Sequence, residues 1–214
     1  MRTICCQAAL FDCDGVLVDS NASVMAAWAR WARQVGLDPA KVCSLVHGRR
    51  SADTVELLVP ERRRAEELAR IDGYELEDAA GVRAVAGAVA LLGRLPRERW
   101  AVVTSGRAVL ARARLQAAGL PCPEVLVAAE DVAAGKPDPA GYRMAAARLG
   151  VSTAAAVVLE DAPAGVEAAR AAGAGSVIGV GERVVAVGVD IWVPDLTALR
   201  WAGEGLELGG QPPA

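Results

Sequence analysis

Polar side chains that could do chemistry follow four short apolar segments of this 214-residue chain, directly or after a loop. They are Asp12-Cys13-Asp14-Gly15, Thr104-Ser105-Gly106, Gly135-Lys136-Pro137 and Glu160-Asp161. The apolar segments resemble buried parallel strands, and in open α/β sheets ligands bind beyond the carboxyl ends of such strands. We therefore expect carboxylates, a hydroxyl and an ammonium group to meet at one edge of a sheet.

The carboxylates in these motifs predict a metal site. Asp12 and Asp14 are two residues apart, so an extended backbone directs both side chains the same way. Together with Glu160 and Asp161 they would place four carboxylates in one place, and their mutual repulsion would be costly. A divalent cation relieves that repulsion, and an all-oxygen ligand set favours Mg²⁺.

Lys136 and Ser105 would complete a cradle for a phosphoryl group, whose transfer depends on positioning and charge neutralisation. Each motif alone has a simpler explanation, as a turn, a helix cap or a helix start. Their joint occurrence after successive strands favours the phosphoryl cradle.

The apolar segments and the stretches between them predict the elements that position these residues. Strands are expected at residues 8–11, 100–104, 125–127, 156–159, 176–180 and 190–193, and helices at 87–95, 107–118, 139–149 and 163–172. Each helix ends near a Gly or a Pro. This alternation predicts an α/β fold with a doubly wound, Rossmann-like parallel sheet.

Residues 17–85 interrupt this alternation, because an ordinary strand-to-helix connection has roughly 2–6 residues. We expect an inserted helical domain there, a core domain formed by residues 1–16 and 86–214, and a loose tail at 209–214. Three inserted helices are expected: one beginning at Ser20 or Asn21 and ending at Gly36, one capped by Ser51 and stopped by Pro60, and one over residues 61–79 with Leu68 and Ile71 inward.

The composition excludes several classes of function. The chain is 53% hydrophobic with a net charge of −3, and it has no basic block, so we expect a core and no nucleic-acid partner. It has no apolar run long enough for a membrane span and no signal-peptide pattern, so we expect a cytoplasmic protein with no membrane partner. Five cysteines without a Cys-x-x-Cys pair, and one histidine, argue against a zinc site. We expect a monomer.

The motifs resemble the four signatures of the haloacid dehalogenase-like superfamily. The matching segments are Phe11-Asp12-Cys13-Asp14-Gly15-Val16-Leu17-Val18-Asp19-Ser20, Val102-Val103-Thr104-Ser105-Gly106, Gly135-Lys136-Pro137-Asp138-Pro139 and Val158-Leu159-Glu160-Asp161-Ala162-Pro163-Ala164-Gly165. The helical insertion is similar to the family's small C1 cap. Residues 27–33, 46–49 and 112–114 resemble bacterial phosphatases that act on hexitol and other polyol phosphates, and related glycerol and 2-deoxyglucose phosphate phosphatases.

The resemblance implies Mg²⁺-dependent hydrolysis of a small sugar or polyol phosphate monoester through an aspartyl phosphate. Asp12 would attack phosphorus, and Asp14 would protonate the leaving oxygen and then activate water. Ser105 and Lys136 would hold the phosphoryl oxygens. Mg²⁺ would bind Asp12, the backbone carbonyl of Asp14 and Asp161, with Glu160 directly or through water.

The expected cap would select the substrate. The substrate-binding candidates beyond the catalytic residues are Gly106, Asn21, His47, Gly48 and Arg49, with Val24, Trp28, Arg50 and Ser51 as further cap candidates. Two alternatives are a phosphosugar mutase and a non-enzymatic protein that binds a phosphate ligand. β-Phosphoglucomutases carry a cap histidine twelve residues after the nucleophile, where this chain has Val24, which favours a phosphatase. All motif acids and Lys136 are present, which argues against an inactive scaffold.

Overall fold

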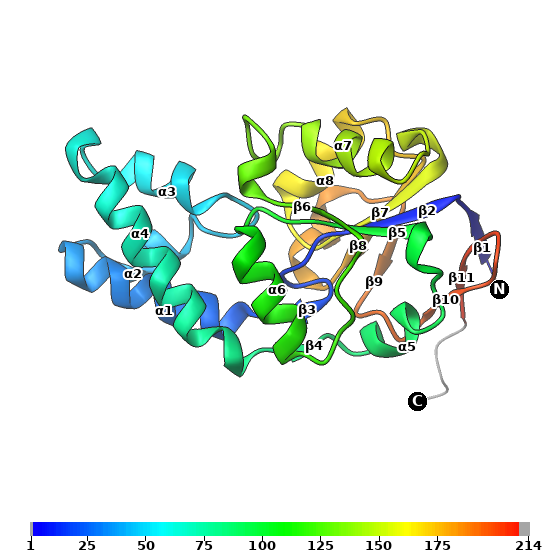
Figure 1. The fold of residues 1–214 in the computed structure, drawn as a ribbon, viewed down its shortest axis with the longest axis horizontal. Helices are drawn as coiled ribbons and strands as arrows, with labels where there is room; N and C mark the ends of the chain where they lie inside the picture. Colours follow the sequence, from blue (N-terminus) through cyan, green and yellow to red (C-terminus); the bar gives the residue numbers. More distant parts are fainter. Residues whose placement is uncertain (1, 210–214) are drawn as a thin grey trace.

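Six parallel strands form the central sheet of the larger lobe in the computed structural model, which describes residues 2–209 (Figure 1). In sheet order the strands are β6 (Val125–Val127), β5 (Trp100–Val103), β2 (Ala8–Phe11), β7 (Ala156–Glu160), β8 (Ser176–Val180) and β9 (Ile191–Val193). All six predicted strands are confirmed. The chain order reverses beside β2, which is where ligands bind in sheets of this kind.

Helices cover both faces of this sheet, which explains why β2 and β7 are buried along their whole length. One face packs against α5 (Ala88–Leu92) and α6 (Ala108–Ala117), and the other against α7 (Ala140–Arg148) and α8 (Pro163–Ala171). Side chains alternate between the faces, so Phe11 contacts Trp100 in one core while Leu10 lies in the other. The four predicted helices are therefore present, although α5 ends before Gly93.

A second sheet was not predicted. It is antiparallel, in the order β1 (Arg2–Cys5), β11 (Gly205–Leu208) and β10 (Leu199–Trp201). Short 3₁₀ turns η1 to η5 occupy Asp78–Gly81, Arg97–Arg99, Ala129–Asp131, Thr153–Ala155 and Glu182–Val187. The predicted loose tail lies, apart from Gly209, outside the described residues.

The smaller lobe is helical (Figure 1). It contains α1 (Asn21–Val35), α2 (Pro39–Cys43), α3 (Ser51–Leu58) and α4 (Glu61–Glu77). These helices enclose a core of their own, in which the rings of Trp28 and Trp31 meet edge to face at 5.4 Å. The indole of Trp31 donates to the buried carboxylate of Glu67 at 3.1 Å. We call this lobe the cap and the larger lobe the core.

The cap differs from the predicted helices in detail. The short α2 was not expected, and α4 ends at Glu77, where the 3₁₀ turn η1 follows. Ser20 precedes α1 as expected but makes no capping bond, because its hydroxyl donates to Asp14. Ser51 is the first residue of α3 rather than its cap, and its hydroxyl donates to Glu75. Both serines therefore bond to acidic side chains instead of to a helix end.

Two short antiparallel strands join the lobes. β3 (Val18–Asp19) leads into the cap and β4 (Arg83–Ala84) leads out of it, with Val18 opposite Ala84. The predicted domain boundaries at residues 17 and 85 lie beside this ribbon. No helix among residues 2–209 has the length and apolar character needed to cross a membrane.

Candidate active site

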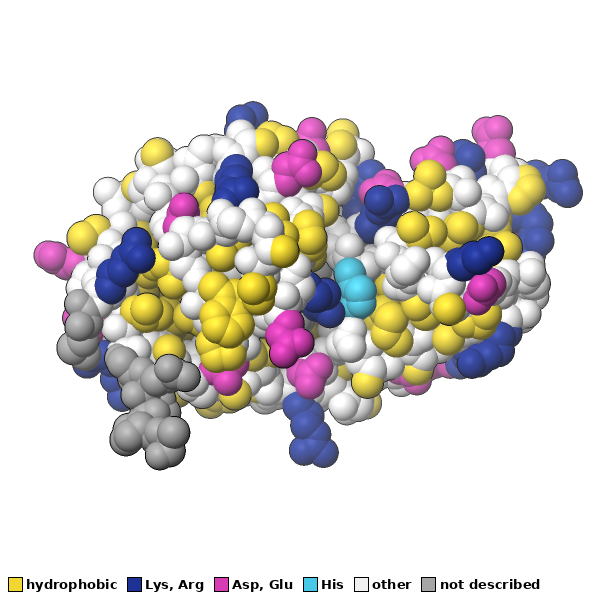
Figure 2. Space-filling model, turned by 180° about the vertical axis from the view of Figure 1, so that it is seen from behind, with side chains coloured by type: hydrophobic (Ala, Val, Ile, Leu, Met, Phe, Trp, Pro, Cys, Tyr) yellow, Lys and Arg dark blue, Asp and Glu magenta, His cyan; other side chains and the backbone are white. Residues whose placement is uncertain are grey.

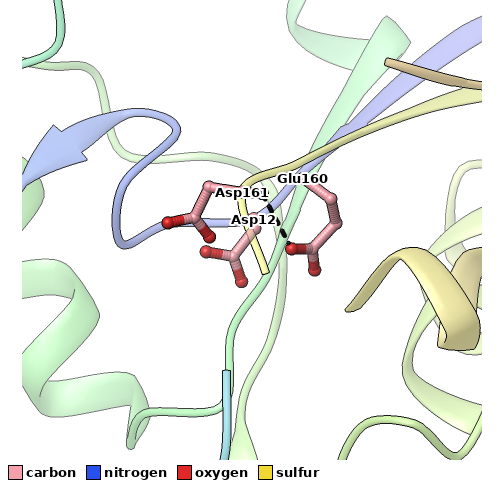
Figure 3. A group of neighbouring side chains, drawn as sticks. All are labelled: Asp12, Glu160 and Asp161. Atoms are coloured by element: carbon pink, nitrogen blue, oxygen red, sulfur yellow. Dashed lines mark hydrogen bonds between the residues drawn. The ribbon is translucent and has the colours of Figure 1, made fainter. Parts of the chain in front are cut away.

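Three carboxylates lie together where two neighbouring strands end. Asp12 follows β2, Glu160 is the last residue of β7, and Asp161 comes next. Phe11 lies opposite Leu159 in the parallel register, so the two strands deliver their acidic residues to the same level. Each of the three carboxylates offers an oxygen within 4.8 Å of the others (Figure 3). All three residues are buried.

Lys136 lies within this cluster. Its ammonium group donates to Asp12 Oδ1, to Glu160 Oε1 at 2.6 Å and to the carbonyl oxygen of Val103 at 3.1 Å. Glu160 also accepts from the Tyr142 hydroxyl at 2.5 Å, and its Oε2 accepts from the backbone N–H of Asp161 at 3.0 Å. Both oxygens of Glu160 are therefore already hydrogen-bonded, whereas Asp12 and Asp161 keep more of their acceptor capacity.

The cluster carries more buried negative charge than Lys136 neutralises. Burial raises the pKa of Asp12 well above its usual value, against the attraction of Lys136, and Glu160 raises it further. Burial and Glu160 raise the pKa of Asp161 to about 6. Burial opposes the charge on Lys136, but Asp12 and Glu160 outweigh it and raise the pKa of Lys136 well above its usual value. The site therefore stabilises additional positive charge, and its oxygen ligands suit a hard divalent cation.

Asp14 does not join the carboxylate cluster. Its Oδ1 accepts hydrogen bonds from Ser20 at 2.6 Å and from Arg114 at 2.8 Å. The expectation of four clustered carboxylates is therefore wrong, because the chain bends at Cys13 instead of staying extended, and Ser20 and Arg114 hold Asp14 apart from the other three. A group of three remains, beside a separately held acid.

Two glycines make room for this arrangement. A Cβ atom on Gly15 would lie 1.9 Å from Asp161 Oδ2, and the positive φ of Gly15 also disfavours any larger residue. A Cβ atom on Gly165, in α8, would lie 1.8 Å from Glu160 Oε1. Both glycines therefore allow backbone to approach the acidic side chains closely.

A cavity of about 70 Å³ separates the carboxylates from the cap. Its core walls include Asp12, Asp14, Ser105, Gly106 and Asp161, and its cap walls include Asn21, Val24, Trp28, His47, Gly48, Arg49 and Ser51. Charged side chains of both signs gather at this junction of the two lobes (Figure 2). Lys136 lines an adjoining cavity that shares Thr104 and Ser105 with the first.

The cap lies directly against the phosphate-binding candidates. The hydroxyl of Ser105 donates to the carbonyl oxygen of Gly48 at 3.1 Å, and a Cβ atom on Gly48 would lie 2.8 Å from Cβ of Ala162. The backbone N–H of Gly106 donates to Thr104 Oγ1 at 3.0 Å. Burial lowers the pKa of His47, and Arg183 lowers it further, which favours the neutral imidazole.

Arg50, a cap candidate for substrate binding, does not line the main cavity. It pairs with Asp53 at 2.7 Å and donates to the carbonyl oxygens of Val132 and Ala133 in the core. Arg50 therefore fastens the cap to the core rather than lining the main cavity.

Sequence reasoning missed three residues that line the cavity: Glu75, Arg114 and Arg183. Arg183 donates to Asp161 and to Asn21, the latter at 3.3 Å, and so connects core and cap. The segment that contains Arg114 contributed to the family resemblance, but nothing in its pattern showed that the guanidinium would be buried.

Comparisons with known proteins agree with this fold and identify its family. A family model for haloacid dehalogenase-like hydrolases matches residues 6–173. Hexitol phosphatase A of Escherichia coli (strain K12) is 43% identical over 173 residues, which cover 78% of this chain and 80% of that protein. Validoxylamine A 7'-phosphate phosphatase of Streptomyces hygroscopicus subsp. limoneus is 36% identical over 209 residues, covering 91% and 96%.

A solved structure of similar shape is β-phosphoglucomutase from Clostridium difficile, with a TM-score of 0.80 over 90% of this chain and 92% of that one. At 20% identity this likeness shows the fold alone. The α/β sheet, the inserted cap and the match over residues 6–173 lead to one assignment: the chain belongs to the haloacid dehalogenase-like hydrolase family.

Proposed function

We propose that this chain is a magnesium-dependent phosphatase that hydrolyses small sugar or polyol phosphate monoesters through a phosphorylated Asp12. The observation that carries the proposal is the position of Asp12. Its carboxylate lies at the floor of the cavity, bonded to Lys136 and grouped with Glu160 and Asp161. The names of the curated relatives, a hexitol phosphatase and a validoxylamine phosphate phosphatase, support phosphate esters as substrates.

The proposed reaction has two displacements. In the first, a carboxylate oxygen of Asp12 bonds to phosphorus as the ester P–O bond breaks, and Asp14 gives its proton to the leaving oxygen. In the second, Asp14 takes a proton from water, whose oxygen bonds to phosphorus while the aspartyl–phosphorus bond breaks. Two easier displacements replace one very slow displacement by water. General acid catalysis of the kind proposed for Asp14 contributes about 10²–10⁴ in rate.

Lys136 and Ser105 are proposed to hold the phosphoryl oxygens. The ammonium group of Lys136 already reaches Asp12, and the Ser105 hydroxyl would exchange the carbonyl of Gly48 for a phosphoryl oxygen. Asp12, Asp161 and the carbonyl of Asp14 would hold Mg²⁺, which when bound neutralises phosphoryl charge. Because both oxygens of Glu160 are hydrogen-bonded, we propose that Glu160 acts on the ion through water and orients Lys136.

The cavity supports a small, hydroxyl-bearing leaving group. Its cap wall combines the polar side chains of Asn21 and Ser51 with the apolar Val24 and Trp28. Polar groups of this kind bind hydroxyls and fix orientation. Val24 lines the cavity at the position where the mutase resemblance requires a histidine, and it can neither donate nor accept a proton. This supports phosphatase over mutase.

Release of inorganic phosphate tests the proposal. Wild-type protein is incubated with hexitol, glycerol, sugar and p-nitrophenyl phosphates, with Mg²⁺ or with EDTA. Asp12→Asn removes the nucleophile, and Glu98→Gln, in an exposed turn before β5, controls for the loss of a charge. We expect Mg²⁺-dependent release from wild type and Glu98→Gln but none from Asp12→Asn.

Three results would contradict the proposal: no release from any ester, full activity in excess EDTA, or full activity of Asp12→Asn. Glucose 6-phosphate forming faster than free phosphate from β-glucose 1-phosphate would indicate a mutase instead.

A further inference from the structure

A buried arginine connects the cap to the acid that the proposed reaction uses. Arg114, on core helix α6, donates from one terminal nitrogen to Asp14 Oδ1 at 2.8 Å. Its other terminal nitrogen lies 3.3 Å from Oε1 of Glu75, on cap helix α4. The Arg114 side chain is 2% exposed and that of Glu75 is 7% exposed. Glu75 and Asp14 therefore hold one guanidinium from opposite lobes.

Glu75 is itself fixed within the cap. Its Oε2 accepts from the hydroxyl of Ser51, the first residue of α3, at 3.1 Å. Arg114 Nε is buried and has no hydrogen-bond partner among residues 2–209. The two terminal nitrogens, and therefore the two carboxylates, set the orientation of the guanidinium plane.

The contacts of Asp14 leave one of its oxygens free. Ser20 and Arg114 both donate to Oδ1, and no residue from 2 to 209 donates to Oδ2. Asp14 lines the cavity and its side chain is 28% exposed. Oδ2 is thus the oxygen that can carry a proton to a leaving group, while Oδ1 is held.

We propose that Arg114 is a positioning residue that makes the acid–base action of Asp14 depend on cap closure, through Glu75. With the cap closed, Glu75 fixes the guanidinium, which holds Oδ1 and directs Oδ2 at the ester oxygen. When the cap moves away, Glu75 leaves and the guanidinium loses one of its two anchors. This inference rests on the proposed phosphatase function.

Two esters with different leaving groups distinguish a loss of Asp14 positioning from a general loss of structure at the site. A polyol leaves as a strongly basic alkoxide and needs the proton from Asp14, whereas p-nitrophenolate leaves readily without one. Asp14 also acts on water in the second displacement, which both esters share, so the first displacement is measured alone, as release of the polyol or of p-nitrophenolate in a single turnover with enzyme in excess. A variant that acts through Asp14 must slow release of the polyol and leave release of p-nitrophenolate nearly unchanged. Asp14→Asn establishes this pattern, with an expected loss of about 10²–10⁴ in the single-turnover rate of polyol release.

The test variants are Glu75→Gln, which keeps the size of the side chain, and Arg114→Lys, which replaces the two terminal nitrogens of the guanidinium with one nitrogen on a shorter side chain. The matched control is Asp72→Asn. Asp72 lies three residues before Glu75 on α4 and also contacts the core, through Arg107 just before α6 at 3.3 Å, but it does not line the main cavity. If Arg114→Lys fails to fold, Glu75→Gln still tests the link.

For Glu75→Gln we expect the single-turnover rate of polyol release from glycerol phosphate or a hexitol phosphate to fall roughly tenfold or more, with less than about a threefold change in p-nitrophenolate release. Asp72→Asn should change neither. Added to Asp14→Asn, Glu75→Gln should cause no further loss, because both substitutions act on one group.

Several results would overturn the inference: equal losses in the single-turnover rate on both esters, a full additional loss in the Asp14→Asn background, or the same pattern in Asp72→Asn. A rise in KM with unchanged kcat would instead identify Glu75 as a direct substrate contact. If wild type releases phosphate from neither ester, both the proposed function and this inference are wrong. If wild type is active and Glu75→Gln is unchanged, the inference alone fails.

Discussion

The buried carboxylates predict that the metal-free protein loses stability as the pH rises. Asp161 is the clearest case, since burial and Glu160 raise its pKa from 3.8 to about 6. A group whose pKa is higher in the folded state contributes stability that is fully present below its unfolded pKa and is lost as the pH rises through its folded pKa. In EDTA, the free energy of unfolding should therefore fall between about pH 4 and pH 7.

The size of the effect follows from the shift. A change of about 2 pKa units corresponds to about 3 kcal/mol, at 1.36 kcal/mol per unit. Asp161→Asn removes this charge, so at pH 7 in EDTA the variant should be more stable than wild type by about 3 kcal/mol. At pH 4 the two should be similar. For a domain of this size that difference is about 6–12 °C in Tm.

Urea unfolding followed by tryptophan fluorescence measures this difference at each pH. Glu98→Gln, exposed in the turn before β5, controls for a change of one in net charge. Mg²⁺ should stabilise wild type at pH 7 and have much less effect on Asp161→Asn, because the ion binds ionised carboxylates. Equal stability of wild type and Asp161→Asn in EDTA at pH 7, or wild-type stability that rises with pH, would refute the reasoning.

Three further predictions concern the site and the cap. Gly165→Ala should lower both Tm and phosphate release, because its Cβ would lie 1.8 Å from Glu160 Oε1; a variant with wild-type Tm and activity would contradict this. Ca²⁺ should inhibit Mg²⁺-supported phosphate release, since its larger and looser coordination shell disturbs in-line geometry; activity equal to that with Mg²⁺ would count against the site. The cap should open about the β3–β4 ribbon and close over a beryllium fluoride adduct of Asp12. X-ray scattering would detect closure as a smaller radius of gyration, and an open cap both with and without beryllium fluoride would argue against this motion.

The sheet of the core and the clustering of its acidic motifs could be predicted because the acidic residues directly follow short apolar segments. The strand before Asp12 and the strand before Glu160 are short, apolar and fully buried, and each is followed by acidic residues. To predict that these acidic residues lie together, it was enough to know that the carboxyl ends of parallel strands lie at the same edge of a sheet. The grouping of Lys136 with these acids follows from the same rule, since its loop lies beyond β6.

The remaining features depend on tertiary contacts that local patterns do not show. Arg114 and Glu75 lie in different lobes, so their pairing is invisible in either helix alone. The direction of the Asp14 side chain depends on the bend at Cys13 and on its contacts with Ser20 and Arg114, not on strand alternation. The β1–β11 pairing joins segments far apart in sequence, each too short to show a strand pattern.

The sheet order also has a consequence for folding during synthesis. β2, which leads to Asp12, is made early, but it pairs only with β5, which begins at Trp100, and β7, which begins at Ala156. At typical translation rates β2 must wait on the order of ten seconds for both partners. Meanwhile α1 to α4 emerge as one continuous segment that already contains the residues of its own core. The cap can therefore form while the strand that leads to Asp12 is still exposed and open to mispairing.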